Sequence, residues 1–297
     1  VRTIRRRIRS VQSTAKITKA MQMIAASKMR FAQLATLAGR PYAEKIENVL
    51  SDLAAQPAEG EQIHPLLIER DITNTAVIHM TPDRGLCGGL PGNLNRSCGD
   101  FILNESSTIT SVAVGKKGRD FLTRTGNQPM AVFTDLPDKA TVEDIMPIAK
   151  LVIDGYMDGS IDKVVLSYPQ FINVTLQTPI IKQLLPVIPS ELSSNETVGY
   201  IYEPSSIDLM ELLLPRYIET EIYHALLESR ACEHSSRMVA MRNATDSAND
   251  MIDSLTLLMN KVRQEAITTE LLLSLIHISE PTRRYAISYA VFCFKKK

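Results

Sequence analysis

The chain has 297 residues, a formal net charge of +0 and an apolar fraction of 44%. This length and composition suit one large globular domain or two modest ones. The four cysteines form no CxxC pair and have no histidine at ligand spacing, which argues against a disulfide framework or a zinc site. No apolar run of about 18 residues occurs, so the sequence predicts no membrane-spanning helix.

The first fifty-odd residues predict one long helix. Residues 14–33 contain neither Pro nor Gly and are rich in Ala, Met, Lys and Gln, which form helices readily. Apolar residues recur at steps of three, four or seven, with one slip, and form a narrow stripe. The stripe contains Ile4, Ile8, Val11, Ala15, Ile17, Met21, Ile24, Phe31, Ala35, Ala38, Tyr42, Ile46, Val49 and Leu53. Such a helix would span about 80 Å, so it needs a long helical partner.

This helix is strongly basic at its start. Its first forty residues contain no Asp or Glu. The basic residues are Arg2, Arg5, Arg6, Arg7, Arg9, Lys16, Lys19, Lys28, Arg30 and Arg40. That composition also fits a mitochondrial transit peptide, but the apolar stripe runs on without a break into the next turns. Since the stripe keeps its phase past Gly39 and Pro41, we expect a kink there and no helix end.

A second pattern follows a linker at residues 57–71. Short β-branched runs at residues 75–81, 111–114, 129–134 and 163–168 alternate with helical patterns at residues 92–103, 118–125 and 141–157. This alternation, with nearly all-apolar strands, predicts a parallel sheet covered on both faces. Thr141 and Asp144 form a capping-box-like start of the last of these helices. Residues 173–177 and 180–187, joined near Pro179, are expected to be antiparallel strands at one edge.

From residue 205 the helical period returns and continues to about residue 273. Its apolar stripe matches the length of the first helix, so the two are expected to pair. The predicted fold class is α/β: a long antiparallel coiled coil of the N- and C-terminal helices with an inserted Rossmann-like lobe. The predicted domains are residues 1–56, 72–204 and 205–273, followed by a separate tail at residues 274–297.

Two glycine-containing turns are candidate anion sites. Residues 83–89 lie between a strand and a helix, yet they match neither GxGxxG nor GxxxxGK[ST], which favours a structural turn. Residues 115–119 offer a second cradle, although a solvated basic turn is the simpler interpretation. Cys87 stands near Arg84, which would lower the pKa of an exposed thiol, but a small buried thiol is the preferred interpretation.

No catalytic constellation emerges from the residue types. The five histidines are far apart in sequence, no GxSxG elbow occurs, and no pair of carboxylates stands out. The basic helix would suit phosphate contacts of a nucleic-acid-binding protein, but its Lys and Arg alternate with Met and Ala and not with stacking aromatics. The residues therefore favour a long helical shaft that binds other proteins over a basic helical nucleic-acid-binding protein. An enzyme is the third choice.

Several segments together resemble one family. Residues 4–33 (IRRRIRSVQSTAKITKAMQMIAASKMRFAQ) are similar to the N-terminal helix of the gamma subunit of the rotary F-type ATP synthase. Further similar segments are DRGLCGG at residues 83–89, VGKKGRD at 114–120, YIYEP at 200–204, PRYIE at 215–219, SSRMVAMRNATD at 235–246 and RQEAITTE at 263–270. The resemblance covers residues 1–272, and Val1 falls a few residues inside the family pattern.

The resemblance implies a central-stalk rotor of the proton-translocating ATP synthase. Its coiled coil would lie inside a hexamer of alpha and beta subunits, and its lobe would sit on the c-ring beside the epsilon subunit. Rotation would change the nucleotide affinity of the three beta subunits one after another. The ATP chemistry would belong to the beta subunits, and the chain itself would be non-catalytic, with no cofactor and no metal. No nucleic acid is an expected partner. With no transit peptide identified, we expect a peripheral protein on the cytoplasmic face of a bacterial plasma membrane.

The resemblance also implies contact residues. Met21 and Arg237 match the rotor–stator coupling region that meets an acidic loop of beta. Further along, Arg263, Gln264, Thr268 and Glu270 match the part of the C-terminal helix that the catch loops hold. Tyr202 and Glu203 match the foot that contacts the c-ring. Because exposed ion pairs attract only weakly, such contacts would let rotation pass with small barriers.

The last residues depart from the family pattern. Residues 274–297 (SLIHISEPTRRYAISYAVFCFKKK) follow no helical seam and include Pro281. They are similar to translated adapter read-through in assembled environmental sequences. We therefore expect this tail to be non-native and to replace the top of the shaft.

Overall fold

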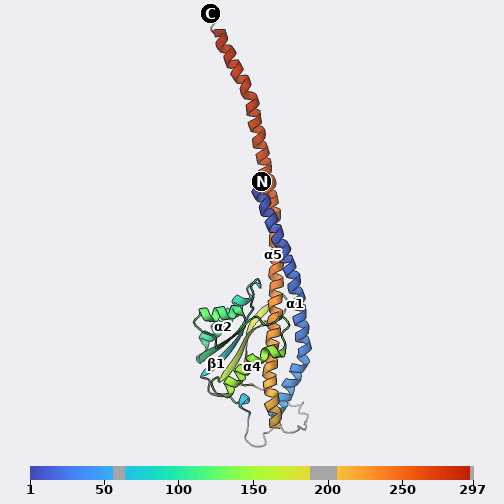
Figure 1. Cartoon of the computed structure of the whole chain (residues 1–297), viewed down its shortest axis with the longest axis vertical. Coiled ribbons are helices and arrows are strands. Elements are labelled where there is room, and N and C mark those ends of the chain that lie inside the picture. The colour runs from blue at the N-terminus through green and yellow to red at the C-terminus, as the bar shows by residue number, and fades with distance from the viewer. Residues whose placement is uncertain (56–63, 188–205, 295–297) are drawn as a thin grey trace. The chain divides into compact units, whose positions relative to one another are not determined.

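The structure is a computed structural model that describes residues 1–55, 64–187 and 206–294. Contacts divide the chain into two compact units. One unit combines Val1–Ala20 with Arg242–Lys297, and the other is Met21–Met241. The two longest helices, α1 (Arg2–Ala55) and α5 (Ser206–Phe294), contribute to both units (Figure 1).

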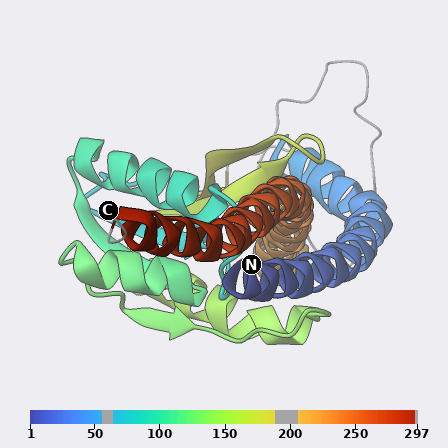
Figure 2. The same ribbon diagram turned by 90° about the horizontal axis from the view of Figure 1, so that it is seen from above.

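In the first unit, α1 and α5 form an antiparallel pair. The dark-blue start of α1 lies beside α5 in Figures 1 and 2. Small side chains occupy this seam: Ala15 and Ala248 are buried, and the hydroxyls of Thr18 and Thr245 share a hydrogen bond of 2.7 Å. Small residues allow the two helix backbones to approach closely, so this end of the predicted coiled coil is confirmed.

The helix α1 does not end at the glycine and proline in its middle. It continues through Gly39 and Pro41 to Ala55. A side chain at Gly39 would place its Cβ 2.8 Å from Cε1 of His224 on α5. In the second unit, Gly39 therefore lets α1 lie directly against the His224 imidazole.

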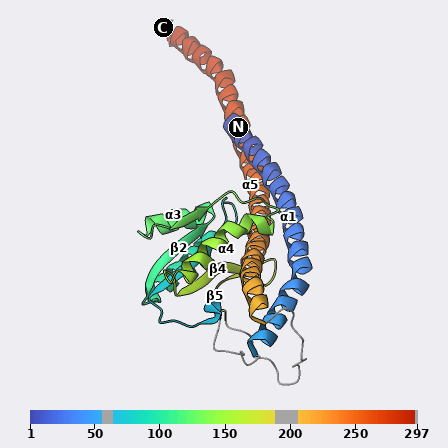
Figure 3. The same cartoon turned by 60° about the horizontal axis from the view of Figure 1, so that its bottom comes forward.

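The α/β lobe lies in the second unit and contains one five-stranded sheet. Its strands are β1 (Asn74–Met80), β2 (Thr108–Val114), β3 (Ala131–Phe133), β4 (Lys163–Phe171) and β5 (Gln177–Leu185). Their order is β3-β2-β1-β4-β5, with the first four parallel and β5 antiparallel to β4. The predicted parallel sheet with an antiparallel edge is confirmed (Figure 3).

Helices cover both faces of the sheet. α2 (Leu90–Asn104) and α3 (Lys116–Arg124) pack together on one face, where Val77, Val165 and Cys98 are buried. α4 (Val142–Met157) packs on the other face, in a core that also includes side chains of α1 and α5. The predicted capping box is present, since the Thr141 N–H donates to Asp144 Oδ2 at 2.8 Å. A short 3₁₀ turn, η1 (Pro65–Leu67), precedes β1.

The edge of the sheet differs from the expectation of two strands joined near Pro179. Residues 173–176 instead form a turn, in which Asn173 Oδ1 accepts hydrogen bonds from the Thr175 and Leu176 N–H groups at 2.9 and 2.7 Å. β5 then runs straight through Pro179, which pairs with Pro169. A proline is tolerated here because β5 is an edge strand and needs no N–H on its outer side.

The helix α5 also extends beyond the predicted end near residue 273. It continues to Phe294 and so includes Pro281. No glycine occurs between residues 274 and 294, so only the single proline opposes helix propagation there. In the described part of the chain, no helix is apolar over enough of its length to cross a membrane.

Candidate functional site

A pocket of about 550 Å³ opens in the second unit. Four segments line it: α1, the β1–α2 loop, the β3–α4 loop and α5. The lining residues are Met21, Ile24, Ala25, Lys28, Asp83, Arg84, Gly85, Leu86, Asp135, Leu136, Pro137, Asp138, Arg230, Glu233, His234 and Arg237. The pocket therefore joins two elements of the shaft with two loops of the lobe.

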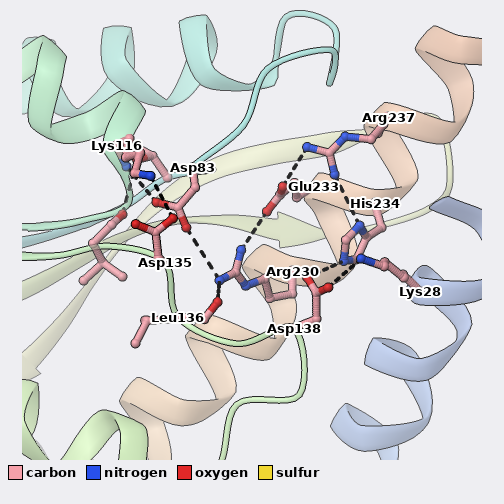
Figure 4. A network of polar contacts seen from close by, with 12 residues as sticks. Lys28, Asp83, Lys116, Asp135, Leu136, Asp138, Arg230, Glu233, His234 and Arg237 are labelled. Atoms are coloured by element: carbon pink, nitrogen blue, oxygen red, sulfur yellow. Dashed lines mark hydrogen bonds and ion pairs between the residues drawn. The ribbon is translucent and has the colours of Figure 1, made fainter. Parts of the chain in front are cut away.

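A ladder of charges on α5 forms one wall of this pocket. Arg230, Glu233 and Arg237 lie three and four residues apart, which places them on one face of the helix. Glu233 contacts both arginines: its Oε2 lies 3.1 Å from Arg230 Nη1 and its Oε1 lies 2.7 Å from Arg237 Nη2 (Figure 4). All three side chains are largely buried, at 10, 6 and 12% exposure. These contacts are thus screened by solvent less than ion pairs on an open surface.

The lobe holds the outer ends of this ladder. Arg230 Nη2 donates to the Leu136 carbonyl at 2.8 Å and lies 3.9 Å from Asp83 Oδ2. Arg237 Nη2 donates to the Gly85 carbonyl at 3.3 Å. Arg230 is therefore tied to both loops that line the pocket, whereas Arg237 is tied to the β1–α2 loop alone.

A second group of charges connects α1 with the β3–α4 loop. Lys28 Nζ lies 2.5 Å from Asp138 Oδ2, and this hydrogen bond lowers the pKa of the Asp138 carboxyl. Asp138 Oδ1 is 3.9 Å from His234 Nε2 on α5. Burial lowers the pKa of His234, so its neutral ring accepts a hydrogen bond at Nδ1 from Arg237 at 3.4 Å. Asp138 therefore pairs with Lys28 on α1 and lies close to His234 on α5.

Both loops of the pocket contain a residue in an unusual backbone conformation. Leu86 has φ of 63° and Asp135 has φ of 57°. They are the only non-glycine residues with positive φ among the described residues. Such conformations are costly and cluster at functional sites. Leu86 is also 61% exposed, so the strained leucine presents an apolar side chain at this site.

The two residues predicted for rotor–stator coupling meet at this pocket. Met21 lies on α1 and Arg237 on α5, far apart in sequence, yet both line it. Arg237 is more buried than the resemblance suggested, because Glu233 and the Gly85 carbonyl already hold its guanidinium. The remaining predicted contact residues lie elsewhere.

Predicted catch-loop contacts lie on the part of α5 in the first unit. Arg263, Gln264, Thr268 and Glu270 are all exposed there. Large apolar side chains of the same stretch are exposed too: Leu257 at 73%, Leu258, Ile267, Leu271, Leu272 and Leu273. Tyr202 and Glu203, the predicted c-ring contacts, lie outside the described residues.

One of the two turns considered as anion sites, at residues 115–119, is closed by the protein itself. At the start of α3, the Lys116 N–H donates to Asp83 Oδ1 at 3.0 Å and the Gly118 N–H donates to Thr81 Oγ1 at 2.7 Å. These N–H groups are the ones that would bind a phosphate. Because they already have acceptors, the turn at residues 115–119 is a structural joint between β2 and α3.

Cys87 is a buried thiol, as preferred from the sequence. It is only 1% exposed, and burial raises the pKa of its thiol. A raised pKa leaves the thiol protonated at neutral pH, which makes it a poor nucleophile.

A buried polar chain in the lobe was not foreseen. His79 Nδ1 lies 3.2 Å from Ser167 Oγ, and His79 Nε2 lies 3.0 Å from Asn95 Oδ1. The three residue types resemble a nucleophile–base–orienter arrangement. However, His79 is 0% and Ser167 1% exposed, so substrate has no access and the chain is part of the core. No group of residues suited to hold a metal ion occurs among the described residues.

We expect His79 to make the stability of the chain depend on pH. Burial lowers its pKa from 6.5 to about 4, so the unfolded state binds more protons between these values. The contribution of neutral His79 to the free energy of unfolding should therefore be fully present above pH 6.5. About 3 kcal/mol of it should be lost as the pH falls from 6.5 to 4. Urea unfolding at a series of pH values measures this loss. A His79→Gln variant removes the titration, and its amide N–H can still donate to Asn95. An equal pH slope in both proteins would contradict the assignment.

Part of the pocket had a detectable sequence signal. Opposite charges at Arg230, Glu233 and Arg237 follow the spacing at which side chains meet on a helix. No local pattern indicated that Asp138 and Lys28 would pair, because 110 residues separate them and only the fold brings them together.

Comparisons with known proteins agree with this architecture. The model of the family described as ATP synthase matches residues 1–272. The "ATP synthase gamma chain" of Dehalococcoides mccartyi is 52% identical over 272 residues, covering 92% of this chain and 95% of that protein. The protein of the same name from Chloroflexus aurantiacus is 46% identical over 273 residues, covering 91% and 94%.

Two solved structures are similar as well. The central stalk and c-ring structure of the Tetrahymena thermophila mitochondrial ATP synthase contains a chain with a TM-score of 0.59 and 26% identity, with 77% of this chain and 99% of that chain covered. A rotor chain of the Euglena gracilis mitochondrial ATP synthase has a TM-score of 0.63 over 90% of this chain and 98% of that chain. Its 19% identity supports the fold alone.

A long helix pair with an inserted parallel-sheet lobe, matched by central-stalk structures, defines a class of shaft proteins. The chain belongs to the ATP synthase gamma chain family. The family match spans residues 1–272, and the chain aligns with nearly the full length of relatives that are about half identical to it.

Proposed function

We propose that the chain is the rotor shaft of a proton-translocating ATP synthase. It works with the alpha and beta subunits of the catalytic hexamer, the epsilon subunit and the c-ring. The observation that carries this proposal is the exposed surface of α5 at residues 257–273, where apolar and charged side chains both face outward. Apolar surface exposed over such a length is typical of a segment that a partner surrounds.

The shaft acts by shape and not by chemistry. Turned by the c-ring, it presents different faces to successive beta subunits and so changes their nucleotide affinity in sequence. ATP synthesis and hydrolysis take place in the beta subunits, and the chain itself contributes no catalytic residue. The similarity of the chain to ATP synthase gamma chains supports this division of labour.

Two sets of residues make the contacts with the stator. Met21 and Arg237 form the coupling contact at the pocket, which is supported by their meeting there from separate helices. Exposed Arg263, Gln264, Thr268 and Glu270 contact the catch loops. For the c-ring, Tyr202 and Glu203 are the proposed contacts, on the resemblance of residues 200–204 to the family.

The chain acts at the cytoplasmic face of a bacterial plasma membrane as a peripheral subunit. Relatives from bacteria support this location. Its domains are residues 1–56, the lobe at 72–204 and residues 205–273. The tail at residues 274–297 is not native, which is supported by the family match ending at residue 272.

Reconstitution tests this function. The chain is mixed with alpha and beta subunits, and the mixture is analysed by gel filtration and ATPase assay. We expect one complex with stimulated ATPase, and a further gain when a family-type C-terminus replaces residues 274–297. Failure of both forms to join the complex would refute the rotor function, whereas equal activity of the two forms would refute only the assignment of the tail.

A further inference from the structure

Glu233 is the centre of the charge ladder in the pocket. Its side chain is 6% exposed, and its two carboxylate oxygens contact two different guanidinium groups, Arg230 at 3.1 Å and Arg237 at 2.7 Å. A carboxylate shared in this way forms two charge-assisted hydrogen bonds at once. The position of both arginines thus depends on one buried side chain.

The two arginines differ in what else holds them. Arg230 also donates to the Leu136 carbonyl at 2.8 Å and lies near Asp83. Arg237 has only longer contacts with uncharged groups, the Gly85 carbonyl at 3.3 Å and the His234 ring at 3.4 Å. Among the described residues, Glu233 is the only carboxylate in contact with Arg237. Arg237 is therefore the member of the ladder whose orientation depends most on Glu233.

We propose that Glu233 is a positioning residue for rotor–stator coupling, which holds the guanidinium of Arg237 in the wall of the pocket and neutralises its charge. This inference rests on the proposed coupling role of Arg237. With Glu233 in place, the guanidinium of Arg237 has a fixed orientation toward the stator and its charge is neutralised. Without it, Arg230 and Arg237 carry a charge that nothing on their own helix face compensates, and Arg237 turns toward any carboxylate a partner offers.

The test uses the whole ATP synthase, assembled with this chain in membrane vesicles. ATP hydrolysis and ATP-driven proton uptake are measured side by side for Glu233→Gln, Arg237→Gln and the double variant. We expect Glu233→Gln to lower the number of protons moved per ATP by at least about twofold, a factor typical of one weak charge contact. The double variant should be no worse than Arg237→Gln alone, because Glu233 acts through Arg237.

A matched control separates positioning from a general loss of structure. Glu219→Gln removes another carboxylate of α5 that pairs with an arginine three residues away, Arg216 at 2.8 Å, outside the pocket. It should leave the proton-to-ATP ratio unchanged. A purely structural defect would lower hydrolysis and proton uptake together through poor assembly, whereas the inference predicts a change in their ratio. Should Glu233→Gln fail to assemble, Glu233→Asp keeps the charge but shortens its reach, and an intermediate ratio is expected.

The outcomes test the positioning role of Glu233 separately from the coupling role of Arg237. A normal ratio for Glu233→Gln with a reduced ratio for Arg237→Gln would overturn the positioning role and leave the coupling role of Arg237 intact. Normal ratios for both would remove Arg237 from the coupling site. Losses that add in the double variant would show that Glu233 acts independently of Arg237, which also contradicts the inference.

Discussion

Replacing Gly115 with alanine is expected to destabilise the lobe by at least about 3 kcal/mol, the range of severe backbone and packing defects. Gly115 has φ of +100°, and a Cβ there would lie 2.0 Å from the carbonyl oxygen of Thr81. Neither group can move cheaply, because Thr81 pairs with Val114 and its hydroxyl accepts from the N–H of Gly118. Thermal unfolding of the purified variant measures the loss.

Gly92→Ala is the matched control for this prediction. Gly92 lies inside α2, and a Cβ there would meet nothing within 4 Å. Alanine should therefore raise helix stability by about 0.5–1 kcal/mol. If Gly115→Ala melted like Gly92→Ala, the close packing of Thr81 against Gly115, between β2 and α3, would be contradicted.

The second large effect is expected at Met21. Met21→Lys adds a positive charge to a pocket wall that already includes Lys28 and Arg237. If an acidic loop of beta meets this wall, one more charge strengthens the attraction by roughly 0.5–1 kcal/mol and slows release at one angle. Protons moved per ATP should then fall by about two- to fivefold while ATP hydrolysis in the beta subunits continues.

Met21→Leu serves as the control because it keeps an apolar side chain of similar volume, and such exchanges are well tolerated. Vesicles carrying each variant are compared for hydrolysis and proton uptake at low and high salt. Salt should partly restore the ratio for Met21→Lys, since exposed charge contacts are screened. A normal ratio at low salt would show that Met21 does not face a charged partner.

Local sequence patterns were sufficient for most of the lobe and for the existence of the helix pair, but not for its seam. Ile17, Ile24, Phe31 and Tyr42 of the predicted apolar stripe are exposed, whereas the small residues Ala15, Thr18, Ala25 and Ala32 are buried. Strands β1 and β4 each contain a short apolar run, so the existence of both strands was visible in the sequence. The end of β4 was not, because the strand continues through Pro169 to Phe171, beyond the predicted end at Tyr168. The capping-box spacing of Thr141 and Asp144 likewise predicted the start of α4. These features depend on neighbours in the chain, which is why they could be predicted.

Features that depend on tertiary context could not be predicted. Pro179 looked like a break between two edge strands, but the structure has one edge strand that continues through it. The resemblance placed Met21 and Arg237 in one region, but nothing local indicated that Asp138 would pair with Lys28 and lie close to His234 there. The buried chain from Ser167 through His79 to Asn95 likewise exists only once β1, β4 and α2 are packed.

The most direct test of the central claim is rotation. The assembled alpha, beta and gamma complex is fixed to a surface, a bead is attached to the lobe of this chain, and ATP is added. A shaft that couples to the beta subunits should turn the bead in one direction, with pauses that lengthen as ATP is diluted. A complex that hydrolyses ATP at the same rate while the bead shows only undirected motion would contradict the rotor function.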